Sequence, residues 1–204
     1  MCVPEAQRRR AEKRDKIIDA AVSVFAERGF HQARVSDIAR LAGVADGTIY
    51  LYFRNKEDLL LSIFEEKMDE LLSGLAVALK HTEHPEEQVR EFARFHFRQV
   101  RENRAAAEVL QVELRLSNKF LKEYRPEKLW AYLEVFGQIT RRGQEQGIFR
   151  SELNPFVTMW AFFGALDELA MQWVLSRKAQ RFDLETAADQ VADMFIRGMR
   201  VDPT

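Results

Sequence analysis

Cysteine, proline and glycine are scarce in this sequence of 204 residues, which holds one cysteine, five prolines and nine glycines. The single Cys2 excludes a disulfide framework and a cysteine-rich metal site. No run approaches the roughly eighteen apolar residues that span a bilayer, and the first residues, MCVPEAQRRRAEKRDK, are too charged for a secretory signal. We therefore expect a soluble cytoplasmic protein.

A charge of one sign is also lacking overall, because the formal net charge is only -1. The charge is unevenly distributed, however. Residues 1–56 carry a net charge of +4 and the remainder carries -5. A basic module that binds a polyanion, joined to an acidic module with another task, fits this distribution.

Helical spacing of apolar residues recurs along the chain, and no stretch alternates apolar and polar residues as a half-buried strand does. The pattern predicts an all-α fold of about nine helices. Gly29 is placed to end the first helix, and Asn154-Pro155 and Asp183 are start signals for the last two. The expected helices cover about 10–28, 36–42, 46–53, 56–80, 85–100, 103–116, 126–147, 155–177 and 184–199.

The segment VSDIARLAGVADGTIYLYFRNKEDLL, residues 35–60, has the spacing of a helix-turn-helix. Ile38 and Ala39 face inward on the first helix, and Gly43 supplies the permissive backbone of a sharp turn. Val44 and Ile49 close a small core beneath the second helix. The N-terminal end of that second helix is then free to meet base edges in the major groove of DNA.

Several polar residues of this segment are candidate DNA contacts. Thr48 and Tyr50 are the leading contacts to bases or sugars, and Gly47 permits close approach. Asp46 suits a helix N-terminus, and its carboxylate can accept from cytosine N4. The candidates for phosphate contact are Arg34, Ser36, Tyr52, Arg54 and Lys56, which starts the following helix.

Spacing alone also fits three short helices of an ordinary bundle. The segment, preceded by an amphipathic helix and followed by YF-x-NK-x-x-LL, closely resembles the DNA-binding domain of TetR-family transcriptional regulators. Many members have a serine at the position of Ala45, so the usual side-chain cap is absent here and Asp46 is the expected substitute. The resemblance implies a DNA-binding domain at 1–56, a linking helix at 56–80, and effector binding and dimerisation within 57–204.

Two strings outside the DNA-binding part narrow the resemblance. QVELRLSN, from Gln111 to Asn118, and FGALDELAMQWVLS, from Phe163 to Ser176, resemble the subgroup that represses fatty-acid degradation genes and releases DNA on binding long-chain acyl-CoA. The resemblance also implies a homodimer joined by helices 155–177 and 184–199. Two-fold symmetry then requires a palindromic operator with half-sites in successive major grooves.

Residues 81–204 alone indicate an apolar helical bundle with a few buried polar groups. Asp167 shares a face with apolar residues and needs a partner, for which Arg115 is a candidate, or a ligand. Structural pairing is the simpler interpretation for Asp167, as a satisfied core histidine is for His96. The arginines from Arg90 to Arg101 fit a solvated face balanced by nearby glutamates.

An acyl-CoA needs an apolar tunnel for its chain and cations for its phosphates. We expect Arg115 and Asn118 near the polar part and Leu133, Phe136, Phe163 and Met171 beside the chain, with Asp167 as a further candidate.

Two other functions remain open. In the first, the same fold senses a hydrophobic or cationic drug through acids such as Asp167 and Glu168. In the second, the chain is an enzyme, but the sequence has no nucleophile elbow, no phosphate-binding glycine loop and no HExxH pair. We therefore expect neither catalysis nor a metal nor a resident cofactor.

Overall fold

The computed structural model describes residues 5–114, 125–176 and 181–201. It confirms the all-α prediction, because these residues form nine α-helices and one π-helical segment. Within the described ranges, the extended pairing found is one isolated bridge between Phe149 and Arg200. The chain divides into two compact units, which we call unit 1 (Met1–Lys67 with Glu108–Arg125) and unit 2 (Met68–Ala107 with Pro126–Thr204).

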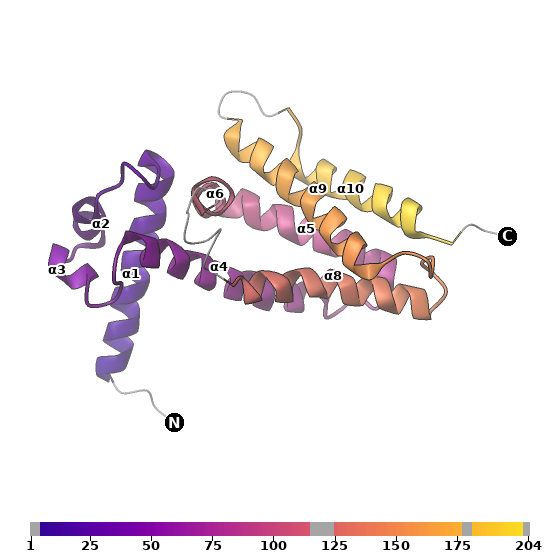
Figure 1. Cartoon of the computed structure of the whole chain (residues 1–204), viewed down its shortest axis with the longest axis horizontal. Helices are drawn as coiled ribbons and strands as arrows, with labels where there is room; N and C mark the ends of the chain where they lie inside the picture. The colour runs from indigo at the N-terminus through magenta and orange to yellow at the C-terminus, as the bar shows by residue number, and fades with distance from the viewer. Residues whose placement is uncertain (1–4, 115–124, 177–180, 202–204) are drawn as a thin grey trace. The chain divides into compact units, whose positions relative to one another are not determined.

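Unit 1 contains α1 (Glu5–Arg28), α2 (Val35–Ala42), α3 (Asp46–Ile49), the first half of α4 (Lys56–Leu79) and the π-helical segment η1 (Val109–Glu113). The helix expected at 10–28 begins earlier, at Glu5, because ion pairs of the i,i+4 type join Glu5 to Arg9 and Arg8 to Glu12. Figure 1 shows α2 and α3 beside α1. The core of unit 1 is made of side chains that are at most 2% exposed: Ile17, Ile18, Ala21, Phe25, Ile38, Ala39, Ile49, Phe53, Leu59, Leu60 and Ile63.

The helix expected at 46–53 is wrong in its extent, because α3 ends at Ile49. The chain continues in tighter turns, in which the amide of Leu51 donates to the carbonyl of Thr48 at 3.1 Å and that of Tyr52 donates to Ile49 at 3.0 Å. These bonds span three residues, as in a 3₁₀ helix. The tighter path buries Phe53 in the core of unit 1.

Unit 2 contains the second half of α4 and five further helices, of which α6 also reaches unit 1 at its last residue. They are α5 (Pro85–Glu102), α6 (Arg104–Glu108), α8 (Glu127–Glu145), α9 (Pro155–Leu175) and α10 (Leu184–Met199). The expected caps are confirmed, because Asn154 accepts from the amide of Phe156 at 2.9 Å and Asp183 accepts from that of Thr186 at 2.8 Å. The helix expected at 103–116 instead passes from α6 into a π-helix at Val109–Glu113.

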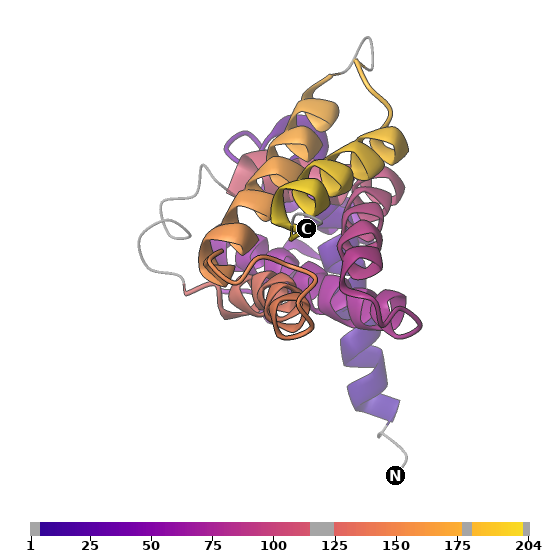
Figure 2. The same cartoon turned by 90° about the vertical axis from the view of Figure 1, so that its right-hand side faces the viewer.

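An aromatic cluster forms the centre of unit 2. The rings of Phe136 and Phe162 are stacked with centroids 4.1 Å apart, and Phe92 lies across both at 5.9 and 5.7 Å. Tyr132 packs on Phe92 at 5.0 Å. Because buried aromatic side chains contribute large apolar areas, this cluster holds α5, α8 and α9 together. The two views agree that α9 and α10 lie side by side (Figures 1 and 2).

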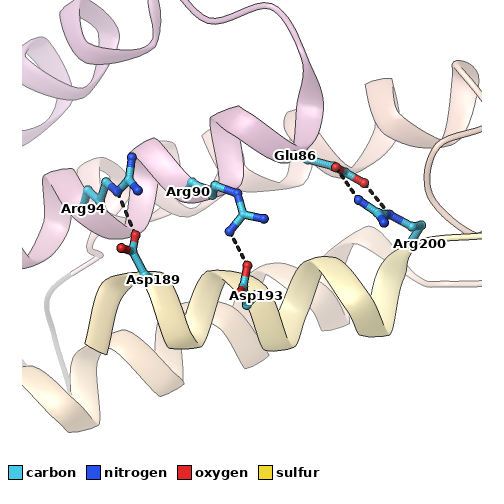
Figure 3. A network of polar contacts seen from close by, with 6 residues as sticks. All are labelled: Glu86, Arg90, Arg94, Asp189, Asp193 and Arg200. Carbon is cyan, nitrogen blue, oxygen red and sulfur yellow. Dashed lines mark hydrogen bonds and ion pairs between the residues drawn. The ribbon is translucent and has the colours of Figure 1, made fainter. Parts of the chain in front are cut away.

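A row of ion pairs joins α5 to α10 (Figure 3). Arg94 pairs with Asp189 at 2.8 Å, and Arg90 pairs with Asp193. Nε and Nη2 of Arg200 each donate to one carboxylate oxygen of Glu86 at 2.7 Å. The interpretation of these arginines as a face balanced by nearby glutamates is therefore wrong for Arg90 and Arg94, because their partners lie on α10. Solvent and salt screen exposed pairs of this kind, so they contribute little to the stability of the fold. Their main effect is to fix the register of α5 against α10.

Candidate functional site

The expected helix-turn-helix is present in unit 1. Gly43 has the left-handed backbone that the turn requires, with φ +69°, and its amide donates to the carbonyls of Ala39 and Arg40. Ile38 and Ala39 are fully buried and Ile49 is 2% exposed, as predicted. Val44 is only half-buried. The turn therefore sets the angle between α2 and α3, and the buried side of each short helix fixes which side remains outward.

The outward side of α3 carries the predicted base contacts. Asp46 and Gly47 are exposed, Thr48 is half-buried, and 56% of Tyr50 is exposed. A Cβ atom added at Gly47 would meet nothing within 4 Å, so the backbone there is open to close approach. Ala45 is the N-cap without a side-chain hydrogen bond. The short helix α3 and its C-cap residue Tyr50 therefore present a carboxylate, a hydroxyl and a phenol together, which suits reading base edges.

The predicted phosphate contacts surround this surface at helix boundaries. Arg34 is the exposed N-cap residue of α2, Ser36 is exposed in its first turn, and Arg54 is exposed ahead of α4. Asn55 accepts from the amide of Asp58 at 2.8 Å, and Asp58 accepts from that of Arg54 at 2.9 Å. This turn forms the N-terminus of α4, and helix N-termini can bind phosphate through their first amides.

The side chain of Lys56 has a different position from the one expected. Its ammonium donates to the carbonyls of Phe30, His31 and Ala33 at 2.5, 3.2 and 3.1 Å, and it lies 4.5 Å from the centre of the Phe30 ring. Burial lowers the pKa of Lys56 from its ordinary value. With three carbonyl acceptors for three N–H bonds, the ammonium anchors α4 to the loop after α1. A phosphate contact from Lys56 stays a prediction. The backbone amide of Lys56 is better placed for that contact than its ammonium is.

One group beside this surface was missed from the sequence. The guanidinium of Arg10, on α1, lies 5.8 Å from the ring centre of Tyr52. Arg14 likewise lies 5.6 Å from Phe53 and pairs with Glu66 at 2.6 Å. The run Arg8–Arg10 was a visible signal in the sequence, but spacing alone does not bring α1 next to Tyr52.

The candidate effector residues of unit 2 fall into three groups. Leu133 and Phe136 are each 1% exposed and belong to the aromatic core. Phe163, Asp167 and Met171 are half-buried on one face of α9, at spacings of four residues. Arg115 and Asn118 lie outside the described residues. The structure thus brings Phe163, Asp167 and Met171, three of the seven candidates, together on one half-buried face of α9.

A polar pair lies inside the aromatic core. Nδ1 of His96 and the hydroxyl of Tyr132 are 3.0 Å apart, and both side chains are buried. Burial lowers the pKa of His96 to about 4, an effect that the charge of Asp167 opposes, and burial raises the pKa of Tyr132. Among the residues that the structure describes, Nε2 of His96 is buried and has no hydrogen-bond partner. The expected satisfied core histidine is therefore satisfied at only one of its two nitrogens.

The described residues contain neither a group of three potential metal-ligating side chains nor a helix long and apolar enough to cross a bilayer. A small hollow of about 90 Å³ lies between α5 and α10, lined by Arg94, Arg98 and Arg101 among others. Arg94 and Arg101 are paired there with acids of α10.

Comparison with known proteins gives two family matches. Residues 17–63 match the bacterial regulatory proteins of the tetR family, and residues 64–198 match the C-terminal region of YsiA-like proteins. The chain is 38% identical over 191 residues to the fatty acid metabolism regulator protein of Bacillus subtilis, covering 92% of this chain and 97% of that one. The relatives of this kind are named as transcriptional regulators.

Two solved structures have the same architecture. The fatty acid degradation regulator FadR from Bacillus halodurans is 41% identical with a TM-score of 0.85, covering 92% of this chain and 96% of that one. FadR from Bacillus subtilis, in complex with stearoyl-CoA, is 38% identical with a TM-score of 0.83, covering 91% and 98%.

The anchoring role of Lys56 predicts a loss of stability when its ammonium is removed. Lys56→Met keeps the apolar stem and leaves three carbonyls without their charged donor, so the free energy of unfolding should fall by about 1–3 kcal/mol. Urea unfolding followed by circular dichroism measures this. Lys80→Met, at an exposed position after α4, should change the value by less than about 0.5 kcal/mol. Equal stability of both variants would contradict the anchoring role.

The buried imidazole of His96 predicts a stability that falls in acid. Its pKa of about 4 in the folded chain lies below the ordinary value near 6.5. Between pH 6.5 and pH 4 the imidazole is therefore protonated in the unfolded chain and uncharged in the folded chain. The free energy of unfolding should therefore drop by about 2 kcal/mol between pH 7 and pH 4.5 through this group alone. The His96→Phe variant should lack this part of the decrease in the free energy of unfolding at acid pH. The exposed control His81→Gln should retain it, and an unchanged acid loss in His96→Phe would refute the assignment.

Proposed function

This chain belongs to the TetR family of DNA-binding transcriptional regulators, and we propose that it is a repressor that leaves a palindromic operator when a long-chain acyl-CoA binds. The observation that carries the proposal is the likeness of 91% of this chain to a regulator whose solved structure holds stearoyl-CoA. We assign DNA binding to residues 1–56 and effector binding and dimerisation to 57–204. The regulated genes would be those of fatty-acid degradation, and the place of action the cytoplasm, where the DNA lies.

The DNA contacts follow from the surface of unit 1. Thr48 and Tyr50, with the open backbone at Gly47 and the carboxylate of Asp46, would discriminate among bases. Arg34, Ser36, Tyr52, Arg54 and the first amides of α4 at Lys56 would hold the phosphates on either side. Phosphate contacts supply affinity and base contacts supply sequence preference.

A homodimer would form through α9 and α10. These helices expose apolar side chains that a single chain leaves uncovered, including Val157 at 59%, Leu175 at 53% and Met194 at 71%. A second copy related by a two-fold axis would cover them and place two copies of α3 in successive major grooves. Because residues 1–56 carry a net charge of only +4, useful affinity should require both copies and weaken steeply with salt.

The effector would lie along α9. Phe163 and Met171 would line its acyl chain, with Asp167 between them on the same face of α9, and Leu133 and Phe136 would form the wall behind. Arg115 and Asn118 remain candidates for the CoA end. Shifting a two-state population from 1:99 to 99:1 takes about 5.5 kcal/mol of preference, which burial of about seven methylene groups supplies. α4 contributes residues to both units, so its displacement would carry the signal.

Release of DNA by acyl-CoA tests the proposal. DNA sites selected by the protein from a random pool should be palindromic, and fluorescence anisotropy should show at least tenfold weaker binding with saturating palmitoyl-CoA or stearoyl-CoA. Free CoA at the same concentration should have no effect, because it lacks the chain. Equal release by acyl-CoA and CoA, or release by neither, would refute the acyl-CoA response.

Two controls separate the parts of this experiment. Tyr50→Ala should lose about tenfold in DNA affinity while still binding acyl-CoA, since one base contact is worth about 1–3 kcal/mol. The exposed Gln138→Ala in α8 should behave as the wild type. Release by cationic dyes in preference to acyl-CoA would instead identify a drug-responsive regulator, with Asp167 and Glu168 at the ligand.

A further inference from the structure

The buried pair of His96 and Tyr132 leaves one polar atom unused, and the need of the phenol proton for an acceptor indicates which atom it is. Tyr132 keeps its proton because burial raises the pKa of its hydroxyl, and Nδ1 of His96 lies 3.0 Å away. A phenol that donates to Nδ1 makes Nδ1 the acceptor of a neutral imidazole. The imidazole proton then lies on Nε2, for which the described part of the chain provides no hydrogen-bond partner.

A buried N–H without an acceptor is rare in native proteins and calls for an explanation. Here the ring of His96 is surrounded by Phe97, with centroids 5.7 Å apart, and by Phe163, with centroids 6.2 Å apart and ring planes at 90°. Neither ring offers a conventional acceptor. The half-buried Phe163 also belongs to the face of α9 assigned above to the effector. The unused donor therefore lies next to that face.

The chemistry of this donor limits what it can bind. An uncharged imidazole in an apolar core offers one N–H bond and no positive charge, so it cannot compensate the burial of a phosphate or a carboxylate. The charge of Asp167, one turn along α9 from Phe163, acts on His96 and would repel a second anion nearby. An uncharged oxygen acceptor is the ligand group that fits.

Resting on the proposed function, we infer that Nε2–H of His96 donates a hydrogen bond to the carbonyl oxygen of the effector's acyl thioester. Tyr132 acts as a positioning residue, because its hydroxyl fixes the proton on Nε2. The site then recognises an uncharged acyl carbonyl within an apolar chain. A free fatty acid, whose carboxylate carries a full negative charge, is rejected by the same arrangement.

A pair of ligands that differ only at the carbonyl tests this inference. Palmitoyl-CoA carries the thioester carbonyl, and S-hexadecyl-CoA has a methylene group in its place. Isothermal titration calorimetry on the full chain should show palmitoyl-CoA binding about tenfold more tightly to the wild type. His96→Phe fills the same space without a donor, so it should bind both ligands within about twofold of each other.

Two further variants separate the donor from general packing. Tyr132→Phe leaves the imidazole but frees its proton to move to Nδ1, so the preference for the thioester should fall to about threefold. Gln99→Ala, on the same helix, should keep the tenfold preference. A His96→Phe variant that folds and retains the full preference would overturn the inference.

The outcomes distinguish this inference from the proposed function. If the wild type binds both ligands equally, the carbonyl contact is refuted while the acyl-CoA response stands. If the wild type binds neither, the acyl-CoA response itself fails, and the inference fails with it. Because the wild-type comparison alone can refute the carbonyl contact, an unfolded His96→Phe variant does not remove the test.

Discussion

His96 lies uncharged inside the aromatic core of unit 2, because burial lowers the pKa of its imidazole to about 4 and Tyr132 satisfies only one of its nitrogens. The position of the ring depends on the packing of α5, α8 and α9 around Phe92, Phe136 and Phe162. That packing excludes water, and without water a polar group needs a partner of matching chemistry. The aromatic cluster therefore holds the three helices together and leaves Nε2–H of His96 available to an uncharged acceptor.

Unit 1 relies on a comparable constraint at a helix start. The ammonium of Lys56 donates hydrogen bonds to three carbonyls of the loop after α1. The side chains of Asn55 and Asp58 accept from backbone amides at the beginning of α4. With the loop and the helix start fixed in this way, the turn at Gly43 and the buried Ile49 decide which side of α3 faces outward. The presentation of Thr48 and Tyr50 follows from these buried contacts.

The sequence predicted the helices well where local signals are strong. Asn154, Asp183 and Gly43 mark caps and a turn by their own chemistry, and the structure has them where expected. The extent of α3 was mispredicted because burial of Phe53 overrides helical spacing. The partners of Lys56, Arg90 and Arg94 lie on other elements, and the unpartnered nitrogen of His96 depends on packing across three helices. No local pattern contains such contacts, whereas the likeness to TetR-family regulators did indicate the function.

Binding of the operator and binding of the effector should each weaken the other through α4, which contributes residues to both units. Thermodynamic linkage makes this opposition reciprocal, so the operator must weaken acyl-CoA binding by the same factor by which acyl-CoA weakens operator binding. The most direct measurement is the dissociation constant of a fluorescent long-chain acyl-CoA with and without saturating operator DNA. We predict an increase of at least tenfold with the operator and none with a scrambled duplex. An unchanged dissociation constant would contradict the central claim that acyl-CoA controls this repressor.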